Sequence, residues 1–99
     1  MKKYVMYTSI WVYDNEGISV LFPALPGCCT CGRAEVDTKL MAKDALKIWC
    51  ETKINELHEE LPKDLELVEL SKWVAERRPE WGKRKWKARI IMEDLEVEE

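Results

Sequence analysis

A chain of 99 residues accommodates one domain, since a chain of this size buries roughly 65% of the surface of its unfolded form in a single core. Hydrophobic residues make up 46% and charged residues 35%, the composition of a compact globular protein and not of a disordered one. The formal net charge of -3 excludes binding to nucleic acid or membranes through overall charge, so any such role must be local.

The first 32 residues predict a three-stranded antiparallel meander. Residues 3–13 have the β-branched and aromatic composition of a strand, and residues 14–17 have that of a short hairpin loop ending in glycine. The second expected strand covers residues 18–22, because Pro23 lacks a backbone donor and ends the ladder. The third covers residues 28–31 and ends at Gly32.

Residues 34–59 predict a long amphipathic helix, since helix formers occur throughout and neither glycine nor proline interrupts them. Small Ala42 and Ala45 would let the helix approach the sheet closely. The face expected to pack there is completed by Thr38, Met41, Ile48, Trp49 and Thr52. On the far side a monomer would expose three apolar residues unless the later segment covers them. Together with a tryptophan of that segment they are candidates for binding a partner: Val36, Leu40, Ile54 and Trp73.

The remaining residues predict a second helix, a final strand and an acidic tail. Helical spacing of apolar residues begins at Leu67 and continues until Pro79 and Gly82 end it, although residues 65–67 also alternate like a strand. Residues 85–93 alternate as a final strand, with one face formed by Trp86, Ala88, Ile90 and Met92. Residues 94–99 are mostly acidic and are expected to be a solvated tail.

The proline-bracketed corner between the second and third strands resembles a known family. Its sequence is Phe-Pro-Ala-Leu-Pro-Gly-Cys, followed by Thr30, by Gly32 and by the helix with Ala42, Ala45, Leu46 and Trp49. This pattern resembles the HicB-like antitoxins of bacteria and archaea over about residues 3–58. The residues that carry the motif are Phe22, Pro23, Leu25, Pro26, Gly27, Cys28 and Gly32, and their expected role is structural.

The resemblance implies a single α+β domain of two layers over residues 1–99, with the order β-β-β-α-(α)-β, sometimes described as a degenerate RNase H-like fold. Its core would comprise residues 3–58 and the final strand. It also implies a non-enzymatic protein that inhibits a HicA-like mRNA-cleaving toxin by binding it. Family members commonly form dimers or larger assemblies, and many carry a C-terminal DNA-binding module. Residues 60–99 show no clear module of that kind.

The sequence predicts no metal, cofactor or catalytic site. Cys28, Cys29 and Cys31 crowd one strand, whereas structural zinc sites space their cysteines around a turn. Reduced thiols fit the cytoplasm, which is the expected location because no segment approaches the length of a membrane span. His58 is the only histidine and lacks a recognisable nucleophile or phosphate loop, so we expect no enzymatic activity.

A basic segment, residues 77–89, supports an alternative function. It interleaves cationic side chains with tryptophans, a pattern that binds phosphates and stacks bases. The candidate nucleic-acid-binding residues are Arg77, Arg78, Trp81, Lys83, Arg84, Lys85 and Trp86. The other interpretation of this segment is a solvated loop that leads into an edge strand, where lysine protects against aggregation. A third possible function is that of an orphan oligomerising module.

Overall fold

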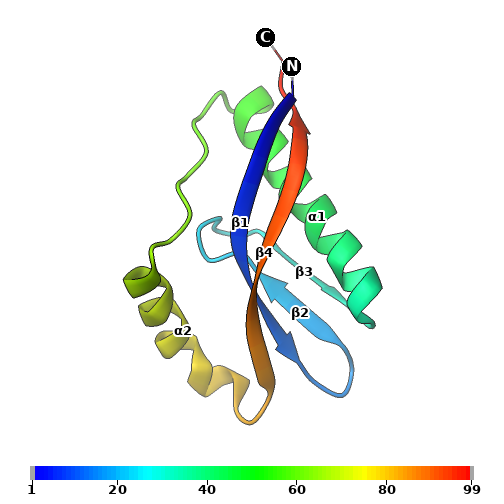
Figure 1. Ribbon diagram of the computed structural model, residues 1–99, viewed down its shortest axis with the longest axis vertical. Coiled ribbons are helices and arrows are strands. Elements are labelled where there is room, and N and C mark those ends of the chain that lie inside the picture. The colour runs from blue at the N-terminus through cyan, green and yellow to red at the C-terminus, as the bar shows by residue number, and fades with distance from the viewer. Residues whose placement is uncertain (1, 99) are drawn as a thin grey trace.

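The computed structural model describes residues 2–98 as a four-stranded antiparallel sheet with one long helix across one face (Figure 1). The elements in chain order are β1 (Lys2–Tyr13), β2 (Ile18–Leu21), β3 (Cys29–Gly32), α1 (Glu35–Glu51), a π-helical turn η1 (Thr52–Glu56), α2 (Leu67–Trp81) and β4 (Lys85–Glu96). The predicted α+β class and the order of elements are confirmed. None of the helices in residues 2–98 is long and apolar enough to span a bilayer.

The sheet is built around β1, in the order β3-β2-β1-β4. β4 pairs with β1 along its whole length, from Lys2 opposite Glu96 to Tyr13 opposite Lys85. β2 pairs with only the last four residues of β1, from Ile10 to Tyr13. The first part of β1 therefore lacks a strand on its β2 side.

The connection between η1 and α2 covers that part of β1. The Tyr7 hydroxyl donates to the Pro62 carbonyl, and the Thr8 backbone N–H and hydroxyl both donate to Oδ2 of Asp64, at 3.0 and 2.7 Å. These bonds satisfy backbone that would otherwise form an open sheet edge. They also set the path by which the chain reaches the opposite face of the sheet.

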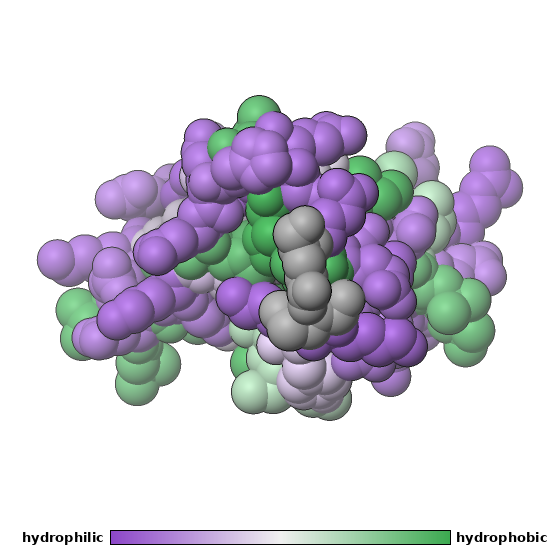
Figure 2. All heavy atoms as spheres, turned by 90° about the horizontal axis from the view of Figure 1, so that it is seen from above, coloured by the Kyte–Doolittle hydropathy of each residue, from purple (hydrophilic) through white to green (hydrophobic). Residues whose placement is uncertain are grey.

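The main core lies between α1 and the sheet. The helix presents Thr38, Ala42, Leu46 and Cys50, four residues apart, to buried sheet residues that include Trp11, Val20 and Leu95. Viewed from the end that carries both termini, hydrophilic atoms cover most of the surface and apolar atoms gather between the layers and on the flanks (Figure 2). The face of α1 that packs on the sheet is rotated by about one residue from the face predicted from the sequence. Met41 and Ile48, which were expected to pack, are 46% and 58% exposed.

Thr38 explains this rotation of the helix. It is fully buried, and its hydroxyl donates to the Ala34 carbonyl at 2.6 Å in the first turn of α1. A Cβ atom on Gly32 would collide with the Thr38 hydroxyl, so the glycine that ends β3 permits this close approach. The N-cap of α1 is Ala34, which forms no side-chain hydrogen bond.

The end of α1 also differs from the prediction. Regular α-helix stops at Glu51, and the chain continues through η1 to Glu56 instead of as α-helix to residue 59. Ile54 lies in this turn and packs against the main core, so its expected exposure was wrong. A π-turn changes the direction in which side chains point, and the periodicity of an α-helix does not register it.

The second helix covers the other face of the sheet. Val74 and Trp81 of α2 form a separate cluster with Ile10 and Val12 of β1, joined by Leu21, Leu70, Trp73 and Trp86. The helix α2 thus adds a third layer to the two that were expected, over the part of the sheet that contains Ile10 and Val12. Pro79 does not end the helix, which continues to Trp81 and stops at Gly82. The burial of Trp81 explains this extension beyond the proline.

The acidic C-terminal segment is largely part of the sheet. β4 extends to Glu96, and Leu95 is fully buried in the main core. The predicted boundary between strand and tail at residue 94 was therefore wrong, because β1 is long enough to pair with these residues. Residue 99 lies outside the described residues.

Candidate partner interface

The outward side of α1 carries an unusual mixture of exposed apolar and acidic residues. Val36, Leu40 and Ile48 are 72%, 64% and 58% exposed, and Met41 lies beside them. The carboxylates of Asp37 and Asp44 are interspersed among them and form no ion pair or hydrogen bond within residues 2–98. We call this set the outer α1 surface: Val36, Asp37, Leu40, Met41, Asp44 and Ile48.

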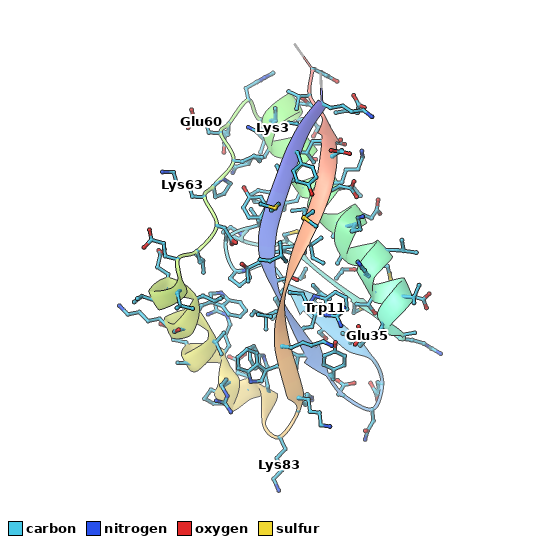
Figure 3. All side chains as sticks on the ribbon, in the orientation of Figure 1. Lys3, Trp11, Glu35, Glu60, Lys63 and Lys83 are labelled. Carbon is cyan, nitrogen blue, oxygen red and sulfur yellow. The ribbon has the colours of Figure 1, made fainter. Side chains whose placement is uncertain are left out.

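Glu35 fixes the start of α1 to the sheet. Its carboxylate accepts a hydrogen bond of 2.6 Å from the Tyr13 hydroxyl and pairs with Lys87 at 3.4 Å and Arg89 at 2.9 Å. The Tyr13 hydrogen bond, assisted by the two cations, lowers the pKa of Glu35. Arg89 also lies over the ring of Trp11, 4.5 Å from its centroid, and Figure 3 shows Glu35 and Trp11 near one another. These contacts hold the outer α1 surface in a fixed orientation.

The structure divides the four predicted partner-binding residues. Val36 and Leu40 lie on the outer α1 surface, whereas Ile54 packs against the main core and Trp73 packs in the α2 cluster. Met41 and Ile48 join the surface but were assigned to the packed face from the sequence. Had the packed face been centred on Thr38, Ala42, Leu46 and Cys50, Met41 and Ile48 would have been predicted to be exposed.

The tryptophans of the basic segment pack on one another. Trp81 is 8% exposed, and its ring centroid lies 6.3 Å from that of Trp73 and 5.8 Å from that of Trp86. Arg77 lies over Trp73, with its guanidinium carbon 4.1 Å from the ring centroid, and Arg78 lies 5.9 Å from that of Trp86. An arginine therefore lies over one face of each of these two rings, where it would compete with a stacking base.

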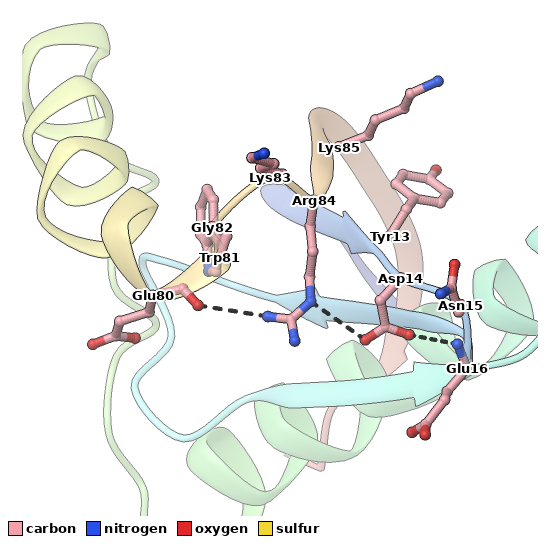
Figure 4. A pocket seen from close by; sticks show the side chains of 10 residues that line it. All are labelled: Tyr13, Asp14, Asn15, Glu16, Glu80, Trp81, Gly82, Lys83, Arg84 and Lys85. Atoms are coloured by element: carbon pink, nitrogen blue, oxygen red, sulfur yellow. Dashed lines mark hydrogen bonds and ion pairs between the residues drawn. The ribbon is translucent and has the colours of Figure 1, made fainter.

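Arg84 and its neighbours line an open hollow of about 860 Å³ at the end of the sheet (Figure 4). The Arg84 guanidinium lies 3.7 Å from the Asp14 carboxylate and 3.5 Å from the Glu80 carbonyl. The lining of the hollow combines acidic Asp14, Glu16 and Glu80 with basic Lys83, Arg84 and Lys85. A lining of mixed charge attracts phosphates less than a purely basic groove would. Binding of nucleic acid stays a prediction.

Solved structures with the same fold include antitoxins and toxin–antitoxin complexes. One, a toxin–antitoxin complex from Streptococcus pneumoniae, has a TM-score of 0.68 at 22% identity over 96% of this chain and 71% of that chain. Another, a HicA3 and HicB3 toxin–antitoxin complex, has a TM-score of 0.60 at 17% identity over 96% of this chain and 100% of that one. The N-terminal domain of the Burkholderia pseudomallei antitoxin HicB has a TM-score of 0.58 at 25% identity, over 86% of this chain and 95% of that one.

The chain has a HicB-like antitoxin fold. By sequence alone no protein-family model and no curated protein matches it. The resemblance read from the proline-bracketed corner is therefore confirmed at the level of three-dimensional structure.

In this HicB-like fold the corner motif is a compact turn. Cys28 N–H donates to the Leu25 carbonyl, Leu25 N–H to the Phe22 carbonyl, and Phe22 N–H to the Cys28 carbonyl, at 2.9, 3.0 and 3.1 Å. The side chains of these three residues are buried, and Gly27 adopts a positive φ of 82°. The Trp49 indole of α1 donates to the Pro26 carbonyl. The motif thus joins the β2–β3 connection to the helix.

The four cysteines do not form a common site. Cys28 and Cys50 are buried, whereas Cys29 and Cys31 are exposed on β3. Residues 2–98 contain no cluster of three or more histidine, cysteine or acidic side chains that could hold a metal ion. Burial raises the pKa of the Cys28 thiol to about 12 and that of the Cys50 thiol to about 11.

Alkylation at pH 8 should therefore distinguish the two pairs of thiols. The thiolate is the reactive form, so the buried pair stays protonated and shielded while Cys29 and Cys31 react. We expect two residues to be modified rapidly in the native protein, and Cys28 and Cys50 at least about 100-fold more slowly. Peptide mass spectrometry after timed iodoacetamide treatment measures this, with guanidinium-unfolded protein as control. Rapid native modification of Cys50 would contradict the packing of α1.

Proposed function

We propose that this chain is an antitoxin that binds a HicA-like mRNA-cleaving toxin and inhibits it by covering its RNA-binding surface. The HicB-like fold carries this proposal, since two of the solved structures with that fold are toxin–antitoxin complexes. Inhibition by occlusion needs only a complementary surface and no catalytic group on the antitoxin. Because mRNA is the target, the proposal places the chain in the cytoplasm.

The outer α1 surface is the docking site that we propose. A protein that cleaves RNA must present lysine and arginine to the phosphates. Asp37 and Asp44 are free to pair with such cations, and their charges would steer a basic toxin to the helix. Val36, Leu40 and Ile48 supply the apolar contacts that provide most of the affinity at the centre of an interface.

Co-expression tests the proposed function directly. The chain is expressed with the product of a small neighbouring reading frame that encodes a basic protein, and the complex is purified through a tag on that protein. We expect a stable complex and suppression of its RNA cleavage at equimolar antitoxin. The absence of a complex, or cleavage that continues at a tenfold excess of antitoxin, would refute the proposal.

A further inference from the structure

β4 is an edge strand whose backbone is covered by side chains only near its C-terminal end. No strand pairs with its outer side in the part of the chain that the structure describes. At that end Lys47 donates to the Asp94 carbonyl and Asn55 donates to the Glu96 carbonyl, at 3.3 and 2.9 Å. The Glu96 N–H donates to the Glu51 carboxylate at 2.7 Å. Side chains of α1 and η1 thus cover the edge of β4 from Asp94 onward.

The centre of the edge presents backbone groups to solvent. Alternate residues of a strand direct their N–H and C=O groups to the same side. The backbone groups of Ala88, Ile90 and Met92 therefore point away from β1, as those of Asp94 and Glu96 do. A groove of about 220 Å³ runs along this edge beside Lys39 and Lys43 of α1. This stretch can accept another strand.

An exposed apolar patch adjoins the free edge. On the face of the sheet away from α1, Ile90 and Met92 are 56% and 45% exposed, and the neighbouring Tyr4 and Met6 of β1 are 58% and 55% exposed. The Tyr4 hydroxyl donates to the Met92 sulfur, which fixes the two side chains together. A long edge strand with an apolar face associates with other strands unless something protects it.

The charges along β4 are complementary to β4 itself in the reverse direction. Basic residues occupy its first half, apolar residues its centre and acidic residues its second half: Lys85, Lys87 and Arg89, then Ile90, Ile91 and Met92, then Glu93, Asp94 and Glu96. An antiparallel copy therefore brings the basic half of one strand beside the acidic half of the other, and with Ile90 at the centre Lys87 faces Glu93. Opposite charges on facing residues stabilise a strand pair, whereas like charges destabilise it.

We propose that two copies of this chain pair through their β4 edges, antiparallel and two-fold symmetric, with Ile90 opposite Ile90. This register sets Ala88 opposite Met92 and Lys87 opposite Glu93. It uses the outward backbone groups of Ala88, Ile90 and Met92 in both copies and forms one continuous sheet. The interface is separate from the outer α1 surface and does not rest on the antitoxin role.

Neighbouring registers are less favourable. Moving the two-fold axis one residue toward the N-terminus sets Arg89 opposite Arg89. Moving it one residue toward the C-terminus sets Ala88 opposite Asp94, whose carbonyl already accepts from Lys47. The register centred on Ile90 avoids both problems.

Sedimentation of the purified chain tests the interface. The wild-type protein should be a dimer, and Ile90→Lys should weaken dimerisation at least about 30-fold, because two like charges then face each other at the axis. Ile90 is exposed in the monomer, so the variant should fold, which circular dichroism checks. Leu67→Lys, at a 79% exposed position on α2, is the matched control and should dimerise normally.

Cross-linking tests the register. In a Cys29→Ser, Cys31→Ser background, Ile90→Cys should form a disulfide-linked dimer under mild oxidation, since facing Cα atoms in a hydrogen-bonded pair lie about 5.5 Å apart. Met92→Cys, on the same face, should not, because the two Met92 positions are more than about 13 Å apart.

A monomer at millimolar concentration, a dimer that Ile90→Lys leaves unchanged, or equal cross-linking from Met92→Cys would overturn the proposal. So would an Ile90→Lys variant that loses toxin binding without any change in its own association, since the edge would then bind the toxin. Loss of dimerisation with normal toxin inhibition would support it.

Discussion

In the complex that we propose, Leu40→Arg and Asp44→Lys should each release the toxin while leaving the chain folded. Leu40 is 64% exposed, so its replacement costs the free chain little stability. In the complex the variant loses an apolar contact and places a cation against a basic partner. Loss of a central interface contact of this kind costs about 2 kcal/mol or more, which corresponds to an affinity at least about 30-fold lower. Calorimetric titration of toxin with each variant measures the change, and renewed RNA cleavage follows from it.

Val68→Arg is the matched control. Val68 is 67% exposed on α2, on the other face of the sheet, and receives the same type of charge on an exposed apolar position. Its toxin affinity should stay within a factor of about 3 of the wild type. Normal binding by both Leu40→Arg and Asp44→Lys would move the toxin site away from α1 but leave the antitoxin role open. Failure of the wild-type chain to bind would refute the role itself.

Local patterns predicted the strands and the main helix because each element repeats its own periodicity. The alternation in residues 3–13 and the glycine-ended loop after it are properties of neighbouring residues, and both were found. The rotation of α1 was missed because it depends on the contact between Thr38 and Gly32, two residues in different elements. Periodicity gives the width of an apolar face, but a tertiary contact selects its centre.

The basic tryptophan segment shows the same limit for a candidate site. Its composition suits the stacking of bases, yet Trp81 is buried because α2 returns to the sheet on the face opposite α1. That return follows from the bonds between Thr8 and Asp64, which are 56 residues apart. No pattern within residues 77–89 contains this information. The exposed Val36 and Leu40 could be recognised because they lie on the side of α1 opposite the packed face, and a rotation of about one residue leaves them in solvent.

Leu95→Ala should cost the protein a large part of its stability. The side chain is fully buried in the main core, on a strand that pairs with β1 through Lys3 opposite Leu95. Truncation of a buried leucine to alanine costs about 2–5 kcal/mol, because the lost transfer energy adds to that of the remaining cavity. A domain of this size is stable by only about 5–15 kcal/mol. The melting temperature should therefore fall by about 10 °C or more.

Glu96→Ala is the control, because its side chain is exposed while its backbone forms the same strand. It should change stability by less than about 0.5 kcal/mol. Urea unfolding of both variants at low protein concentration separates this effect from association through β4. A solvated acidic tail, by contrast, would make Leu95→Ala as neutral as Glu96→Ala. The backbone groups of Glu93 and Leu95 face β1, so their amides should exchange slowly with solvent. In a solvated tail the same amides would exchange rapidly.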